Sequence, residues 1–299
     1  MMSPVYRRDR IAWRSLQHPH WRRHTIRTRH RKALKLAVEF ISPYRRAVVG
    51  ALLALVFTAG VTLGLGQGLR ILVDQGLATE SPENLARVRE LSQIAPWVYG
   101  TQGVHPHDAG TYSDSAEAEI RAHAGDDKIV AVGEIGLDYF YDNAERNVQR
   151  DVFRRQLQIA CDTDRPVVIH SRDADEDTIE ILQEYEATLK RRGVIHSFTS
   201  GPGLAQYALD QGWCLGFNGI TTFNKAENVR DIVRMAPIGQ ILLETDSPFL
   251  TPAPYRGREN APFYIPFVAE KIAAVKDLGL EEVLATTYQN SLRTFFPQP

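Results

Sequence analysis

Six short apolar runs alternate with helix-like segments after residue 84, and this alternation restricts the fold more than any other feature of the chain. The runs are rich in Val and Ile and are bounded by turn residues, which is typical of buried strands. They read WVYGTQGVHP, IVAVGE, PVVIH, VIHSF, CLGFNG and ILLETD. The segments between them predict helices over residues 85–95, 114–123, 143–162, 175–191, 203–211 and 224–234, before closing helices through 296. Strands that alternate with helices pair in parallel, so we expect an α/β fold built of βα units.

Four of the runs carry a side chain that can bind a metal ion at or near their last residue. These side chains are Glu134, where we expect the strand to break off into a turn, His170, His196 and Asp246. Any one of them could be an ordinary core or turn residue, but four in separate strands predict a shared site. All strand ends of a barrel open into one mouth, which favours a TIM-type barrel over a doubly wound sheet. Two imidazoles and two carboxylates suit one or two divalent ions such as Mg, Mn or Zn, and such an ion activates water for hydrolysis.

Residues from about 85 to 296 resemble the TatD family of metal-dependent deoxyribonucleases. The resemblance rests on several long motifs in the family's order: GVHPHDA (103–109), VGEIGLDYFYD (132–142), VFRRQLQIA (152–160), PVVIHSRDA (166–174), IHSF (195–198), LGFNGITTF (215–223) and LLETDSPFLTPAPYRGREN (242–260). It implies a (β/α)8 barrel that cleaves DNA with one or two divalent cations.

The same resemblance implies a role for each candidate residue. Glu134 is the carboxylate that can bridge the metals, His170 and His196 are imidazole ligands, and Asp246 is a ligand that also orients or deprotonates the attacking water. His105 sits where the family approaches substrate phosphate. Positive charge alone suggests two further phosphate contacts, Arg172 and Arg256.

The family's opening strand, which carries a His-x-His pair and is followed by a helix and a second strand, has no counterpart here. We therefore expect a barrel that lacks its first two strands and holds at most one ion well. Two other His-x-His strings occur, at residues 18–20 and 105–107. Neither ends a strand beside Asp246, so we expect neither to replace the missing pair.

The first 84 residues have a different character. Residues 1–46 contain 13 Lys or Arg and two Asp or Glu, so we interpret them as a basic tail. Residues 47–69 contain no ionisable side chain, which predicts a membrane-spanning helix with its N-terminus inside, although a buried helix is the alternative. Residues 41–78 resemble the first membrane helix of an ABC exporter. We place the helix and its exit at 47–78, a linker at 79–84 and the hydrolase domain at 85–299.

The sequence therefore predicts a metal-dependent hydrolase that cleaves phosphodiester bonds in DNA. The alternative is a membrane-anchored, non-catalytic or chimeric protein that carries a truncated, inactive barrel. The family resemblance implies a cytoplasmic location, whereas residues 47–69 imply a membrane. No protein partner can be inferred.

Overall fold

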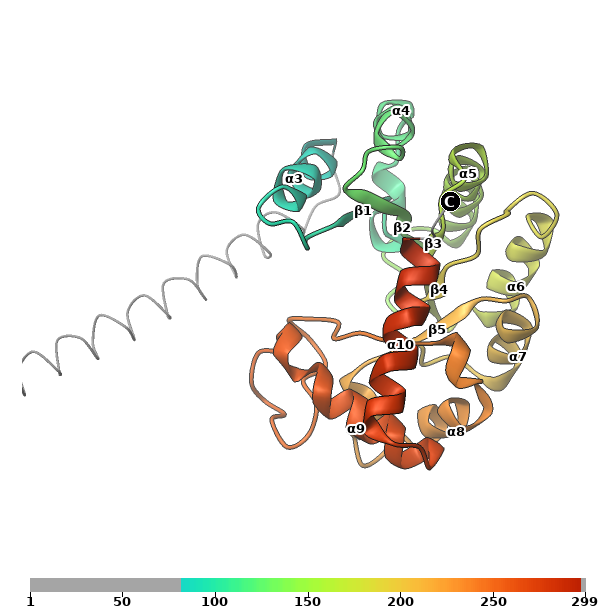
Figure 1. Ribbon diagram of the computed structural model, residues 1–299. Helices are drawn as coiled ribbons and strands as arrows, with labels where there is room; N and C mark the ends of the chain where they lie inside the picture. Colours follow the sequence, from blue (N-terminus) through green and yellow to red (C-terminus); the bar gives the residue numbers. More distant parts are fainter. Residues whose placement is uncertain (1–81, 297–299) are drawn as a thin grey trace, which may run out of the picture. The chain divides into compact units, whose positions relative to one another are not determined.

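A six-stranded parallel sheet forms the centre of the fold. The computed structural model describes residues 82–296, which fall within one compact unit, Ile71–Pro299. The sheet order is β1-β2-β3-β4-β5-β6 (Figure 1). The strands are β1 (Gly100–Gln102), β2 (Ile129–Asp138), β3 (Val167–Arg172), β4 (Val194–Ile195), β5 (Cys214–Phe217) and β6 (Ile241–Leu243). All six predicted strands are present, and the expected parallel α/β architecture is confirmed.

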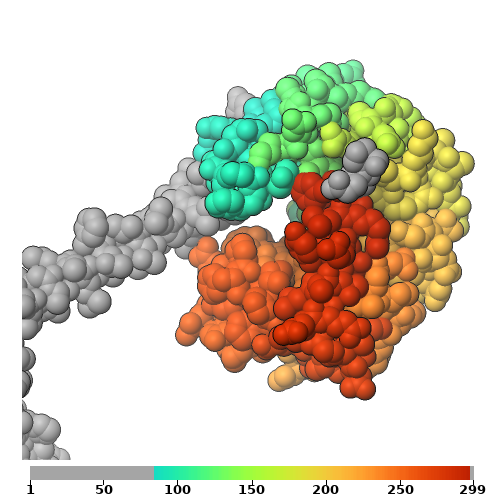
Figure 2. Space-filling model, viewed as in Figure 1, coloured from blue at the N-terminus to red at the C-terminus, as the bar shows by residue number. Residues whose placement is uncertain are grey.

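Each described strand pairs with the next one along the chain, so β1 and β6 are the two ends of the described sheet. On the face shown in Figure 2, a recess separates the residues around β1 from those that follow β6. The predicted tail at residues 1–46, the predicted span at 47–69 and the linker up to residue 81 lie outside the described residues. Within residues 82–296, no helix has the length and apolar character needed to cross a bilayer.

Strand β2 differs from the prediction. We expected it to end at Glu134, but it continues to Asp138, and Glu134 lies in its middle. The pairing with β3 shifts register between Val132 and Ile135 and then resumes. After this shift, residues 135–138 of β2 pair with residues 169–172 of β3. Gly136 permits this close approach: its φ is +140°, and a Cβ there would lie 2.0 Å from the carbonyl oxygen of His170.

The helices surround the sheet, and the last of them lies across the strands (Figure 1). They are α3 (Pro82–Ser92), α4 (Asp114–His123), α5 (Arg146–Thr163), α6 (Asp175–Glu184), α7 (Pro202–Asp210), α8 (Glu227–Met235), α9 (Ile265–Lys276) and α10 (Leu280–Phe295). Their apolar sides and the strands form one large core, which includes Phe153, Ile169 and Trp213. Helix α3 begins inside the predicted linker, with proline in its first turn. Helix α6 ends well before the predicted residue 191.

Helix α10 packs across the beginnings of the later strands. Phe295 packs against the first residues of β4 and β5, Val194 and Cys214, and against Leu242 in β6. The Asn290 side-chain amide donates 2.9 Å to the carbonyl of Ile241, the first residue of β6. With α10 across the amino-terminal ends of these strands, the opposite ends are available for a site.

Candidate metal centre

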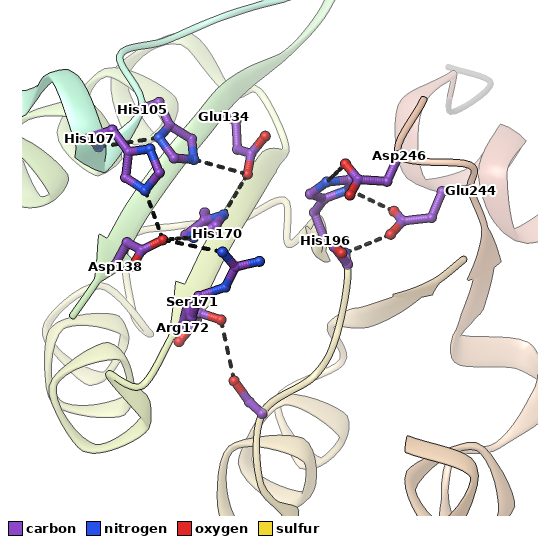
Figure 3. Close-up of polar contacts among 12 residues, drawn as sticks. His105, His107, Glu134, Asp138, His170, Ser171, Arg172, His196, Glu244 and Asp246 are labelled. Atoms are coloured by element: carbon purple, nitrogen blue, oxygen red, sulfur yellow. Dashed lines mark hydrogen bonds and ion pairs between the residues drawn. The ribbon is translucent and has the colours of Figure 1, made fainter. Parts of the chain in front are cut away.

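Three side chains from adjacent parts of the sheet converge on one point (Figure 3). His105 precedes a short 3-10 helix, η2 (Pro106–Thr111), Glu134 lies in β2 and His170 in β3. Glu134 Oε1 is 2.8 Å from His170 Nδ1 and 3.5 Å from His105 Nε2. Each residue offers one ligand atom, and the three atoms lie within 4.8 Å of one another. Direct metal ligands lie about 2 Å from their ion, so a small rearrangement would let all three reach one cation.

Asp138 contacts the nitrogen of the His170 ring that does not face Glu134. Its Oδ2 lies 3.0 Å from His170 Nε2 and 2.9 Å from His107 Nε2, while its Oδ1 accepts from the N–H groups of Phe140 and Tyr141. The Asp138 side chain is completely buried. A carboxylate on one ring nitrogen orients the other nitrogen of a metal-binding histidine, so Asp138 leaves His170 Nδ1 directed at Glu134.

A second group of side chains follows β4 and β6. His196 comes directly after β4, and its Nδ1 lies 2.8 Å from Glu244 Oε2 while its Nε2 lies 3.3 Å from Asp246 Oδ1. Glu244 is anchored in turn, because its Oε1 accepts from the N–H of Ser197 at 2.6 Å. Glu244 is therefore placed to orient His196, just as Asp138 orients His170. Ser197 and Asp246 adopt left-handed backbone conformations, with φ of +46° and +58°.

Residues of both groups line one pocket of about 570 Å³, whereas Asp138 and Glu244 lie behind its lining. All four residues predicted as metal ligands line it, together with His105 and Arg172. The Arg172 guanidinium lies 3.8 Å from Asp138 Oδ2 and extends into the pocket wall. Arg256, which we predicted to contact phosphate, is not among the lining residues; its guanidinium lies 3.8 Å from the centre of the Phe223 ring. Cation–π stacking holds the guanidinium there, and its contact with phosphate stays a prediction.

His105, for which the family resemblance implies contact with substrate phosphate, lines this pocket. We expected neither histidine of residues 105–107 to replace the missing metal pair, because neither ends a strand beside Asp246. The structure places His105 beside Glu134 and His170 instead. Its neighbour His107 faces Asp138, so only the first histidine of the pair at 105–107 joins the metal-capable group.

Sequence reasoning missed Asp138 and Glu244. Both carboxylates lie four or two residues from a predicted ligand in the strings GEIGLD and ETD, but an acid near a strand end has many possible roles. Only the fold shows that Asp138 faces Nε2 of His170 and that Glu244 faces Nδ1 of His196. The one signal that could have suggested them is a second carboxylate an even number of residues from a predicted ligand, because such residues lie on the same face of a strand.

The electrostatics of the pocket favour a cation. Burial would raise the pKa of Glu134, but hydrogen bonds with His105 and His170 hold that pKa well below its usual value. Burial lowers the pKa of His105. For His170, burial is outweighed by hydrogen bonds with Asp138 and Glu134, and its pKa is raised. The pocket thus keeps the Glu134 carboxylate ionised, and a carboxylate beside imidazoles is a donor set that suits Zn, Mn or Mg.

The sequence matches the family described as TatD related DNase over residues 46–296, which is most of the chain. The chain belongs to the TatD family. It is 37% identical over 211 residues to the uncharacterized metal-dependent hydrolase YabD of Bacillus subtilis, covering 71% of this chain and 82% of YabD. It is 32% identical over 223 residues to the 3'-5' ssDNA/RNA exonuclease TatD of Erwinia amylovora, covering 73% of this chain and 85% of that protein.

A solved structure agrees with this assignment. YjjV, a TatD homologue from Escherichia coli K12, superimposes with a TM-score of 0.68 at 30% identity, over 73% of this chain and 84% of YjjV. This TatD family chain therefore has the TIM-barrel-like fold of its relatives and is a metal-dependent hydrolase. The resemblance of residues 41–78 to an ABC exporter is not supported, and the TatD family match itself begins at residue 46.

Replacing Asp138 by asparagine is expected to weaken metal binding about 10- to 100-fold, because the amide no longer holds His170 in its orientation as an anion does. Isothermal titration of the metal-free protein with Mn²⁺ measures the effect. Asp126→Asn, at an exposed acid between α4 and β2, is the control. Equal affinities of Asp138→Asn and the native protein would contradict the orienting role.

Metal affinity is also expected to depend on pH. The pKa of His196 is raised well above its usual value, because attraction to Glu244 and hydrogen bonds with Asp246 and Glu244 outweigh burial. The pKa of His170 is raised as well. A cation needs a deprotonated imidazole, so affinity should rise with pH until these raised pKa values are passed and then level off. Titrations between about pH 6 and pH 9 test this. Constant affinity over that range would show that neither imidazole binds the ion.

Proposed function

We propose that this chain hydrolyses phosphodiester bonds in DNA. The main support is that carboxylates and imidazoles from both groups line the same pocket with an arginine. Negative charge in the carboxylates attracts a cation, and Arg172 provides the positive charge that a phosphate needs. The name of the Erwinia amylovora relative supports nucleic acid as the substrate class.

Each side chain has a proposed role in this reaction. Glu134, His170 and His105 would hold the first ion, a role for His105 other than the phosphate contact that the family resemblance implies. His196 would be a metal ligand on the other side of the pocket, with its ring oriented by Glu244. A bound Mg, Mn or Zn ion lowers the pKa of water and neutralises charge on the phosphate.

Asp246 is proposed as the group that accepts the proton of the attacking water. Its Oδ1 lies 3.3 Å from His196 Nε2, which keeps the carboxylate at the pocket wall. The water oxygen then bonds to phosphorus, one phosphorus–oxygen ester bond breaks, and the departing oxygen takes up a proton. Asp246 is also a potential ligand of a second ion.

The test is hydrolysis of a fluorescently labelled single-stranded oligonucleotide by the full chain. The protein is first freed of metal with EDTA and then supplied with Mg²⁺, Mn²⁺ or Zn²⁺. We expect cleavage that requires added metal and that is much slower in the Glu134→Gln variant. Absence of cleavage with every metal, in protein that titration shows to bind Mn²⁺, would contradict the proposal and favour a non-catalytic metal-binding protein.

A further inference from the structure

Two large aromatic side chains line the candidate pocket and are nevertheless exposed. Tyr141 is 55% exposed and Phe249 is 69% exposed. Trp97 and Phe263 are exposed as well, so exposure alone does not indicate a ligand; Tyr141 and Phe249 differ because they line a pocket rich in charged groups, where they can contact one.

The position of Tyr141 is fixed by the first metal-capable group. Its N–H donates to Asp138 Oδ1 at 2.9 Å, and the same carboxylate contacts His170. Its ring lies edge-on to that of His107, with centroids 5.2 Å apart, and the Arg172 guanidinium is 5.3 Å from its centroid. The ring is thus held beside the guanidinium that is proposed to bind phosphate and close to the proposed ligands.

The position of Phe249 is fixed by the second group. Its N–H donates to the carbonyl of Asp246 at 2.8 Å. Its own carbonyl accepts from the Asn260 side chain, which also donates to the carbonyl of Thr245 and is buried. Phe249 therefore follows β6 as Tyr141 follows β2, and each ring belongs to one of the two groups that face each other across the pocket (Figure 3 shows the two groups).

We propose that Tyr141 and Phe249 stack on unpaired bases of a single-stranded nucleic acid, one on each side of the phosphate held at the metal centre. This inference rests on the proposed function. Every base has a π-face, so two rings beside a charged site bind a strand without regard to sequence. Bases in a duplex are stacked on one another and paired, so their faces are not available to these rings. The preferred substrate is then a single strand.

Binding measurements test the stacking separately from hydrolysis. The probes are labelled oligothymidylates about 12 nucleotides long, a length typical of single-strand sites. They carry phosphorothioate linkages to slow cleavage, and they are compared with an abasic chain of equal length and charge and with a duplex. Fluorescence anisotropy in Mg²⁺ is recorded for the native chain, Tyr141→Ser, Phe249→Ser and Tyr141→Phe. Tyr288→Ser is the control, because Tyr288 is 61% exposed on α10.

We expect the native chain to bind the base-bearing strand more tightly than the abasic strand or the duplex. Each serine variant should lose roughly 5- to 100-fold of affinity for the base-bearing strand and almost none for the abasic strand. Tyr141→Phe and Tyr288→Ser should behave as the native chain does. Equal losses on both strands, equal binding of duplex and single strand, or no preference for bases would overturn the inference. Base-dependent binding without cleavage of an ordinary oligonucleotide would count against the proposed hydrolysis alone.

Discussion

Glu134→Gln is expected to lower kcat/KM for a single-stranded oligonucleotide by about 10²- to 10⁴-fold. Glutamine keeps the size of the side chain but removes the charge that attracts a cation and that His105 and His170 face at 3.5 Å and 2.8 Å. Metal affinity should fall together with the rate, since a neutral amide is a weaker ligand for a divalent ion. Steady-state kinetics and Mn²⁺ titration on the same preparation measure both effects.

A fold defect would mimic this loss, so the control is a matched substitution elsewhere. Glu281→Gln changes an exposed carboxylate in the first turn of α10, far along the chain from the pocket residues. It should leave rate and metal affinity unchanged. Retention of more than about a third of the native rate by Glu134→Gln would exclude Glu134 as an essential ligand.

Asp246→Asn is expected to reduce kcat by about 10²- to 10⁴-fold while the affinity for the first ion stays nearly native. The reason is that Asp246 contacts His196 and belongs to the second group, whereas the first ion is proposed to lie between Glu134, His170 and His105. An asparagine cannot accept the proton of the attacking water. Kinetics and Mn²⁺ titration again measure the two quantities.

The kcat and the Mn²⁺ affinity of Asp246→Asn together distinguish two roles for Asp246. A fall in rate alone supports proton transfer. An equal fall in metal affinity would show instead that Asp246 is a ligand of the ion measured. Ser247→Ala, at the exposed neighbouring position, is the control for disturbance of this turn.

Local sequence patterns predicted the strands and the ligand-type residues because both depend on short-range features. Val and Ile runs identify β3 and β6, and a histidine or acid near such a run is visible without a fold. The extension of β2 past Glu134 was not predictable in this way, since it depends on pairing with β3. A glycine pattern such as GEIGLD reads equally well as a turn.

The partners of the ligands depend on contacts between distant parts of the chain. Asp138 contacts His170 across 32 positions, and Glu244 contacts His196 across 48. Charge alone also could not show that the Arg256 guanidinium packs over the ring of Phe223. Position along a strand was predictable, whereas the direction in which each polar group points was not.

The two groups of site residues belong to different halves of the described sheet. His105, Glu134 and His170 come from the part that ends with β3, while His196 and Asp246 follow β4 and β6. The register between β3 and β4 comprises two residue pairs, Val168 with Val194 and Ile169 with Ile195. A cation that takes ligands from both groups would therefore cross-link the halves at this narrow seam. Its binding free energy would then add to the free energy of unfolding of the whole sheet, so the ion would stabilise the fold as well as take part in the reaction.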